Sequence, residues 1–225
     1  MNMPATAQPN QSLGSLAVQI PGATAVFRKL KLDFCCGGQQ SLEKACADKQ
    51  LDLNTVLGEI RALQHQQPMP AAPSAGELID HILLRYHEVH RQQLPELIRM
   101  ARRVEAVHRD HPLVPQGLAD HLETMEQELL EHMSKEEQIL FPLLKQGGHP
   151  MVVHPIGVMR HEHVSHGEQI ERLAEFTHQH QPPRDACNTW QALYAGTARL
   201  TEDLIEHIHL ENNLLFPAFE GQAQH

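Results

Sequence analysis

The chain has 225 residues, with 18 Lys and Arg against 28 Asp and Glu, so its formal net charge is −10. This acidic balance argues against nucleic acid as a partner, because phosphate binding needs clustered basic side chains, and it disfavours adsorption to anionic lipid. The start MNMPATAQPNQ is not a secretory signal, and no apolar stretch approaches membrane-spanning length. With only four cysteines, which excludes a disulfide scaffold, we expect a cytoplasmic protein without membrane or nucleic-acid partners.

Residues 1–65 are predicted to form a small helical domain. Asp52 is a plausible N-cap for the last of its helices, because a side-chain oxygen at that position accepts a backbone N–H of the first turn. The expected helices of this domain cover residues 13–20, 23–30, 42–49 and 54–63.

The chemical feature of this small domain is the stretch Asp33-Phe34-Cys35-Cys36-Gly37-Gly38. Adjacent cysteines do not easily form a disulfide with each other, and the glycines allow a tight turn that would expose the thiols. Cys35 and Cys36 are therefore candidates for redox exchange or soft-metal binding, the alternative being a small buried pair in a turn. Cys46 and Cys187 are interpreted as structural.

Residues 66–75, rich in Pro, Gln and Ala, are predicted to be a linker, and residues 76–225 a helical bundle. Four long stretches with helical periodicity follow the linker, separated by RDHPLVPQG, KQGGHPMVVHP and HQHQPPRDA. The Pro and Gly of these separators end helices. The sequence thus predicts an all-α fold, a four-helix bundle with up-down-up-down topology.

An internal repeat supports this prediction. HMSKEEQILFP at residues 132–142 matches HIHLENNLLFP at residues 207–217, with His, Glu, Leu, Phe and Pro at the same offsets. His87-x-x-His90 is likewise echoed by His163-x-x-His166. The bundle is therefore predicted to be a duplicated helical hairpin.

His and Glu interrupt the apolar stripe of the second and fourth bundle helices at equivalent levels. Residues four apart lie on one face of a helix, so His132 with Glu136, and His207 with Glu211, each offer an imidazole and a carboxylate to one site. Burying these carboxylates is costly unless a cation compensates. The two stripes are Leu118, Leu122, Met125, Leu129, His132, Glu136, Leu140, Leu143, and Leu193, Thr197, Leu200, Leu204, His207, Glu211, Leu214, Ala218.

A buried His–Glu hydrogen-bonded pair explains one such helix as well as a metal does, but two helices in register favour a metal. The first and third helices supply a further histidine each, and the pattern does not choose between His87 and His90, or between His163 and His166. Four His and two Glu shared by two ions leave open positions, which suits iron or manganese better than structural zinc. His81, His121, His161 and His209 lie off the stripes and are expected to be exposed.

The motifs DFCCGG, RYHEVHR, HMSKEEQILFP and HIHLENNLLFP together resemble the iron–sulfur cluster repair di-iron protein family. That resemblance covers nearly the whole chain and implies a hemerythrin-like bundle behind a short Cys-Cys domain. It implies two iron ions in an oxo- and carboxylate-bridged centre, with Glu136 and Glu211 bridging. The implied ligands are His87, His132, Glu136, His163, His207 and Glu211.

The resemblance also implies a function, which is repair of iron–sulfur clusters damaged by nitric oxide or hydrogen peroxide through supply of iron. Damaged iron–sulfur proteins would then be the partners, and a homodimer is compatible with this reading. The alternatives are reversible binding of nitric oxide or oxygen, and reduction of nitric oxide or peroxide at the di-iron centre.

Overall fold

The structure of the chain is a computed structural model that describes residues 7–64, 73–148 and 150–220. It divides into two compact units, of which the first comprises residues 1–74 with 208–218 and the second residues 75–207 with 219–225. Most of the predicted linker, 66–75, lies outside the described residues.

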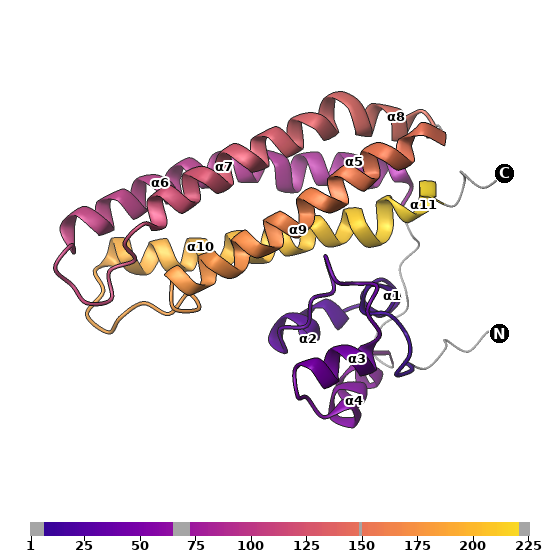
Figure 1. The fold of residues 1–225 in the computed structure, drawn as a ribbon, viewed down its shortest axis with the longest axis horizontal. Helices are drawn as coiled ribbons and strands as arrows, with labels where there is room; N and C mark the ends of the chain where they lie inside the picture. Colours follow the sequence, from indigo (N-terminus) through magenta and orange to yellow (C-terminus); the bar gives the residue numbers. More distant parts are fainter. Residues whose placement is uncertain (1–6, 65–72, 149, 221–225) are drawn as a thin grey trace. The chain divides into compact units, whose positions relative to one another are not determined.

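The first unit contains four short helices at the predicted places, coloured indigo to purple in Figure 1. Side-chain caps begin three of them: Ser12 accepts from the Ser15 N–H at 3.2 Å, Ser41 from Lys44 at 3.3 Å, and Asp52 from Thr55 at 2.7 Å. Each cap satisfies a backbone donor that the helix cannot pair internally, which fixes where these short helices start. The helices are α1 (Leu13–Gln19), α2 (Ala23–Lys29), α3 (Leu42–Asp48) and α4 (Leu53–Gln64).

The second unit is built on long helices that run alongside one another, as the sequence predicts (Figure 1). The all-α bundle is thereby confirmed. Its first two helical passes are α5 (Ala75–Ile82), η1 (Leu83–His87) and α6 (Glu88–Val107), then α7 (Leu118–Lys135), η2 (Glu136–Leu140) and α8 (Phe141–Lys145). After the short turn η3 (Pro150–Val152), the last two are α9 (Val153–Phe176) and α10 (Asn188–His209), which continues along the chain into η4 (Leu210–Leu215) and α11 (Pro217–Glu220). Residues 208–218, and with them η4, are grouped with the first unit.

The segments η1, η2 and η4 are π-helical turns, each of which contains or adjoins a residue of the predicted metal site. In η4 the Phe216 N–H bonds the Glu211 carbonyl at 2.9 Å, five residues back. Pro142 and Pro217 each lie two residues after the last residue of the π-turns η2 and η4. A proline lacks the N–H for the usual helical bond and crowds the carbonyl four residues before it, so a wider turn relieves both.

These π-turns shift the buried stripe by one residue, which corrects part of the prediction. Leu143 and Ala218 are exposed and Leu214 is only part-buried. Leu144, Leu215 and Phe219 are buried instead, because a π-turn holds an extra residue that the regular helical period does not count. Upstream of the turns the predicted stripes are buried as expected.

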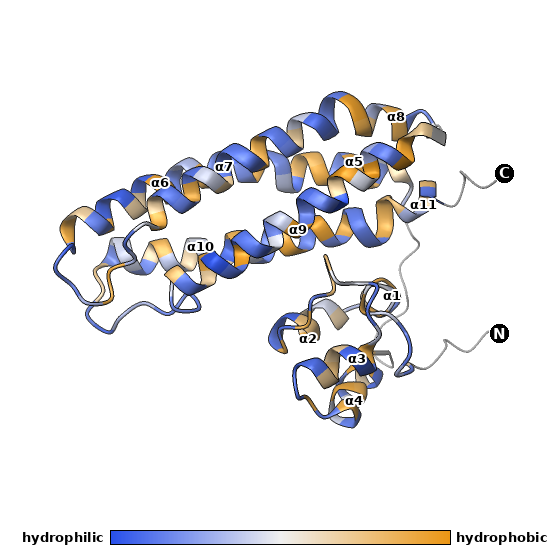
Figure 2. Cartoon of the chain, in the orientation of Figure 1, coloured by the Kyte–Doolittle hydropathy of each residue, from blue (hydrophilic) through white to orange (hydrophobic). Residues whose placement is uncertain are grey.

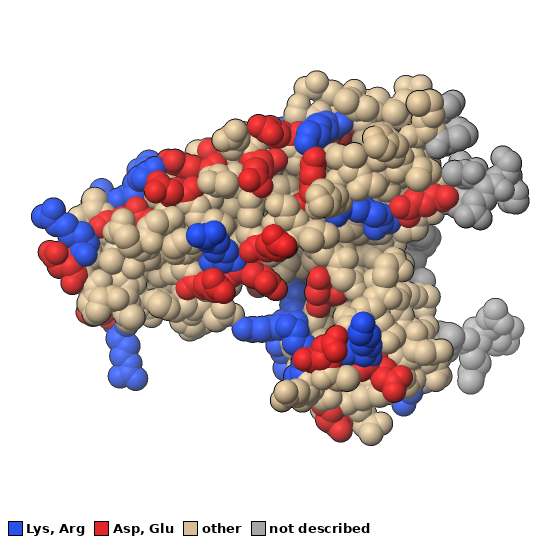
Figure 3. Space-filling view, in the orientation of Figure 1, with Lys and Arg blue, Asp and Glu red and all other residues tan. Residues whose placement is uncertain are grey.

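The bundle core lies between the helices of the second unit and contains Trp190 and Tyr194 among aliphatic side chains. Hydrophilic and hydrophobic segments alternate along α6, α7, α9 and α10 in Figure 2, as expected for amphipathic helices with one buried face. None of the helices in the described part of the chain is long and apolar enough to cross a membrane. On the face shown in Figure 3, acidic side chains are interspersed with basic ones and no extended basic patch is present among the described residues.

Candidate metal centre

Two groups of potential metal ligands lie at the π-turns of the bundle, and both include Glu136 and Glu211. Within each group, one ligand atom from every residue lies within 4.8 Å of the others. All of these side chains are buried, and Glu136 and Glu211 are 0% exposed. The first group is His87, Glu136, His207 and Glu211, and the second is His132, Glu136, His163 and Glu211.

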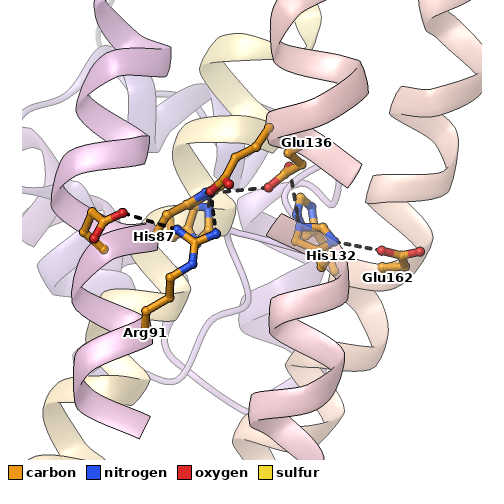
Figure 4. Close-up of polar contacts among 9 residues, drawn as sticks. His87, Arg91, His132, Glu136 and Glu162 are labelled. Atoms are coloured by element: carbon orange, nitrogen blue, oxygen red, sulfur yellow. Dashed lines mark hydrogen bonds and ion pairs between the residues drawn. The ribbon is translucent and has the colours of Figure 1, made fainter. Parts of the chain in front are cut away.

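Glu136 lies between the two groups and presents one oxygen to each. Its Oε2 is 3.4 Å from Nε2 of His87, and its Oε1 is 3.5 Å from Nε2 of His132. Figure 4 shows the carboxylate between these two imidazoles. Such a placement suits a carboxylate that bridges two cations, and it is expensive for an ionised group that has none.

The spacing of the imidazoles also fits a metal. Nε2 of His87 is 3.3 Å from Nε2 of His207, and Nε2 of His163 is 3.1 Å from Nε2 of His132. Two nitrogens bound at right angles to one ion, each about 2.1 Å from it, lie about 3.0 Å apart. The residues present therefore fit two metal ions, each with two imidazoles and a share of two carboxylates.

A carboxylate outside each group orients one of its imidazoles. Nδ1 of His87 is 2.7 Å from Oε1 of Glu137, which also accepts a bond from Arg91 at 2.7 Å. Nδ1 of His132 is 2.9 Å from Oε2 of Glu162 (Figure 4). With Nδ1 donating to a carboxylate, Nε2 keeps its lone pair and is the atom that can ligate.

The same contacts act on the two outer carboxylates. The hydrogen bond from His132 and the contact with Lys135 outweigh burial and lower the pKa of Glu162 to about 2. Burial opposes ionisation of Glu137, but the hydrogen bonds from His87 and Arg91 are stronger together and hold its pKa below the usual value. Glu137 and Glu162 are therefore both ionised at neutral pH, and each can stabilise positive charge on the imidazole that it contacts.

The structure brings His87 and His163 into the two groups, and not His90 and His166. Both of the latter are buried next to a member of a group. The ring of His90 stacks near His207 with centroids 5.5 Å apart, and the ring of His166 meets that of His132 edge-on at 5.0 Å. Burial lowers the pKa of His166 to about 4, so it is neutral at physiological pH.

The first unit holds a third potential metal group, Asp33, Cys35 and Cys36. The two sulfur atoms are 3.6 Å apart, and Asp33 accepts backbone N–H bonds from Cys36 at 2.9 Å and Gly37 at 2.8 Å. The hydrogen bond with Cys36 and burial raise the pKa of Cys35 well above its usual value. At neutral pH its thiol is therefore protonated.

Two asparagines that the sequence reasoning missed tie this loop to the segment 208–218 within the first unit. The side-chain amide of Asn212 donates to the Cys35 carbonyl at 2.9 Å, and that of Asn213 donates to the Phe34 carbonyl at 2.9 Å. A Cβ on Gly14 would come within 2.2 Å of the Asn213 side-chain oxygen, so this packing needs glycine. The pair Asn-Asn directly after Glu211 is the only sequence signal for this role.

The expectation that His209 is exposed is wrong. It is buried in the first unit, with its ring edge-on to Phe34 at 5.2 Å and its Nδ1 2.9 Å from the Asn213 amide. His121 is part-buried, and its Nε2 faces the Gln169 carbonyl at 3.0 Å. Both residues lie off the apolar stripe of their own helix, so only the packing of other segments could reveal their burial.

Comparison with known families gives two matches on this chain. The hemerythrin HHE cation binding domain matches residues 78–219, and a domain of unknown function, ScdA_N (DUF542), matches residues 9–64. The first match covers the helices that carry the His and Glu groups, and the second covers the unit with the cysteine pair.

Several similar proteins carry the name iron–sulfur cluster repair protein YtfE. Those of Citrobacter koseri and Escherichia coli O81 are each 50% identical to this chain over 211 residues, which is 92% of this chain and 96% of the relative. The protein of Enterobacter sp. strain 638 is 49% identical over the same share. The chain therefore belongs to the family of iron–sulfur cluster repair proteins that join an ScdA_N domain to a hemerythrin HHE domain.

Proposed function

We propose that this protein binds two iron ions and repairs iron–sulfur clusters damaged by nitrosative or oxidative stress, by donating iron. The observation that carries the proposal is the pair of buried His and Glu groups that share Glu136 and Glu211. The relatives that are similar over most of the chain are named for cluster repair. We assign the clients as damaged iron–sulfur proteins and the compartment as the cytoplasm.

The proposed ligands are His87 and His207 for one ion and His132 and His163 for the other, with Glu136 and Glu211 bridging. Imidazole and carboxylate ligands without thiolate suit iron or manganese, and six ligands shared by two ions leave positions open. We assign iron because the relatives are named for iron–sulfur cluster repair. A thiolate-free site also holds iron less firmly than a sulfur-rich cluster would. Bound iron would supply both a transferable ion and a place where a small molecule can bind.

The chain's own residues prepare the site before metal arrives. Glu137 and Glu162 hold the His87 and His132 rings with Nε2 directed inward, and the apolar core beyond Leu129 keeps bulk water from the carboxylates. Preorganised ligands cost little reorganisation on binding, and the like charges of the two bridging glutamates favour ions between them.

The cysteine pair has a separate proposed role. Cys35 and Cys36 would contact the recipient protein or carry reducing equivalents, and they are not ligands of the iron pair. Hydrogen bonds from Asn212 and Asn213 tie the loop of this pair to the segment that directly follows Glu211 in the sequence.

Metal analysis with Mössbauer spectroscopy tests the centre. We expect two magnetically coupled irons per chain in the wild type and loss of coupling in His132→Ala. A single zinc ion in the wild type would contradict the proposal.

Transfer of iron tests the activity. Under reducing, anaerobic conditions the loaded protein should restore the cluster of an apo iron–sulfur acceptor while losing its own iron. No cluster formation with a fully loaded protein would rule out donation.

A second candidate function is binding or reduction of nitric oxide, oxygen or peroxide at the same iron pair. The buried polar surroundings of the centre, including His90 and His166, favour it. Catalytic consumption of nitric oxide with a reductant, abolished by Glu136→Ala, would identify this function.

A further inference from the structure

Tyr86 is a buried tyrosine that packs on a proposed ligand of the metal centre. It lies in η1 directly before His87 and is 5% exposed. Its ring stacks on that of His207, with the centroids 5.5 Å apart and 9° between the ring planes. Nearly parallel packing of this kind restricts rotation of the imidazole, because a large turn would drive it into the ring beside it.

The internal repeat shows which residue has the equivalent place in the other half of the bundle. Tyr86 stands where the other hairpin has Glu162, each directly before a histidine of a His-x-x-His motif. Glu162 holds the ring of His132 through the hydrogen bond from Nδ1 at 2.9 Å. Tyr86 contacts His207, which is the repeat equivalent of His132. Equivalent positions therefore contact equivalent imidazoles in both halves, one with a carboxylate and the other with an aromatic ring.

The tyrosine ring is itself held by an ion pair. Arg85 precedes Tyr86 in η1, and its guanidinium carbon lies 4.9 Å from the centroid of the Tyr86 ring. Both terminal nitrogens of Arg85 donate to the carboxylate of Asp203 on α10, at 2.6 Å and 3.3 Å. A guanidinium that donates to both oxygens of a carboxylate has a fixed direction, so it stays over the ring.

These contacts determine how η1 meets α10 at the metal centre. Asp203 and His207 are four residues apart on α10 and so lie on one face of that helix. They contact Arg85 and Tyr86 of η1, respectively. The same η1 carries His87, whose Nε2 is 3.3 Å from Nε2 of His207. The two imidazoles that would share an ion thus come from two segments that these contacts join.

We propose that Tyr86 is a positioning residue for the metal ion of the first group, and that Arg85 and Asp203 hold it in place. The stacked ring keeps Nε2 of His207 directed toward Nε2 of His87, so the pair is set for a divalent ion before one binds. The ion of the second group does not depend on this contact. The inference rests on the proposed function and deepens it by assigning a residue that acts on one ion of the two.

The test measures binding of ferrous iron by the metal-free full chain and needs no assay of cluster repair. Anaerobic competition with a chromophoric chelator gives the affinity for each of two irons, and thermal unfolding gives the stability of the apo protein. The variants are Tyr86→Leu, which removes the stack, Tyr86→Phe, which keeps it, and Arg85→Met, which removes the ion pair. Tyr194→Leu is the matched control, because it removes another buried tyrosine of the bundle core.

We expect Tyr86→Leu to weaken one iron by about 10-fold to 100-fold, the loss typical for a residue that orients a metal ligand, and to leave the other within about two-fold. Tyr86→Phe should bind both irons like the wild type. Arg85→Met should weaken the same iron, by less than Tyr86→Leu does. Tyr194→Leu should lower the unfolding temperature and keep both affinities.

Two ligand variants identify the iron that responds. His87→Ala removes a ligand of the first group and His132→Ala one of the second, so each should retain one iron. Adding Tyr86→Leu should weaken the iron that is left in His132→Ala and should not change the iron that is left in His87→Ala. The opposite pattern would assign Tyr86 to the other ion and overturn the inference.

Three further results would also overturn it. Unchanged affinities in Tyr86→Leu would show that the stack does not position His207. Equal weakening of both irons, or the same weakening in Tyr194→Leu, would show that lower stability is the whole effect. An iron bound as weakly in Tyr86→Phe as in Tyr86→Leu would show that the ring is not the group that acts.

The remaining outcomes are also decisive. If Tyr86→Leu does not fold, Arg85→Met takes its place, because unchanged affinities there contradict the role. If a ligand variant binds no iron, the number of irons that Tyr86→Leu weakens decides alone. A wild type without two irons would instead refute the proposed function.

Discussion

The bundle and the cysteine loop both bring metal-binding side chains together, but their carboxylates are used differently. Glu136 is fully buried, with an imidazole nitrogen beside each of its oxygens. Asp33 accepts the backbone N–H groups of Cys36 and Gly37 and so holds the turn of the loop. The first carboxylate lies where two cations could share it, whereas the second holds the turn of its own loop.

The potential ligands beside these carboxylates differ in the same way. His87 and His132 donate from Nδ1 to Glu137 and Glu162, so Nε2 is ready to bind. The pKa of Cys35 is raised by its hydrogen bond with Cys36 and by burial, so its thiol must first lose a proton. The difference teaches that proximity of His, Cys and carboxylate groups is a weaker criterion for a resident metal than the protonation state of each ligand atom.

The largest effect is expected for Glu136→Gln. An amide has one oxygen and no charge, so it does not bridge two ions, and iron affinity should fall by more than about 100-fold, beyond the loss typical for an outer-sphere change. Iron content after gel filtration with a chelator measures this loss. Glu131→Gln, at an exposed position on α7, is the matched control and should keep both irons. Retention of two coupled irons in Glu136→Gln would show that Glu136 is not a bridge.

A smaller effect is expected for the carboxylates that orient the imidazoles. Glu162→Gln and Glu137→Gln should each release iron about 10-fold to 100-fold faster, because a neutral amide orients the ring but stabilises it less. Release to a chromophoric chelator measures the rate. Asp33→Asn, in the cysteine loop, is the comparison and should release iron like the wild type. Equally faster iron release in all three variants would show that the carboxylates of the bundle do not differ from Asp33 in their effect on bound iron.

The protonated state of Cys35 can be measured directly. Because the thiolate is the reactive form and the pKa of Cys35 is raised, iodoacetamide at pH about 8 should modify it at least about ten-fold more slowly than the exposed Cys187. Its rate should continue to rise above pH 8 as the Cys35 thiol ionises. Site-resolved mass spectrometry gives both rates in one sample. Equal rates at pH 8 would show that Cys35 is already a thiolate and prepared for metal.

The smallest effect concerns the caps that hold the cysteine unit together without metal. Hydrogen bonds from Thr55 lower the pKa of Asp52 below its ordinary 3.8. Since the folded-state pKa is depressed, the stabilisation is present above pH 3.8 and is lost as the pH falls through the folded value. Asp52→Ala should lower the Tm at pH 7 by about 2 °C, and this difference should shrink in acid.

Asp52→Asn separates the cap from its charge. The amide oxygen still accepts the Thr55 N–H, so the Tm at pH 7 should stay near that of the wild type. The acid-dependent part of the difference from Asp52→Ala should disappear. Thermal unfolding of the apo protein, followed by circular dichroism, gives both results. A Tm in Asp52→Ala equal to the wild type at every pH would show that this cap adds no stability.

Much of the fold could be read from the sequence because it is locally encoded. The apolar period of the long helices, the Pro and Gly of their separators and the cap at Asp52 act within a few residues of where they stand. The repeat of His132–Glu136 as His207–Glu211 placed two ligand pairs at equivalent levels before any contact was known. The structure puts all four residues in the two groups.

Helical periodicity did not decide which histidine of each His-x-x-His motif faces the two groups; the family resemblance implied His87 and His163, and the tertiary structure places these two there. His90 and His166 lie on the same stripes as His87 and His163, so periodicity treats them alike. The regular helical period also does not predict the π-turns, which displace the buried stripe to Leu144 and Leu215. One extra residue in a turn changes which face of the helix each later residue occupies.

The sequence by itself determined the bundle, its duplicated hairpin and the type of ligand, because these depend on residue spacing along one helix. The contacts between helices decided the rest. Glu137 reaches His87 across 50 residues, Glu162 reaches His132 across 30, and Asn212 reaches the Cys35 carbonyl across 177. Hydrogen bonds of that range depend on how separate elements pack, and no local pattern of polar residues specifies them.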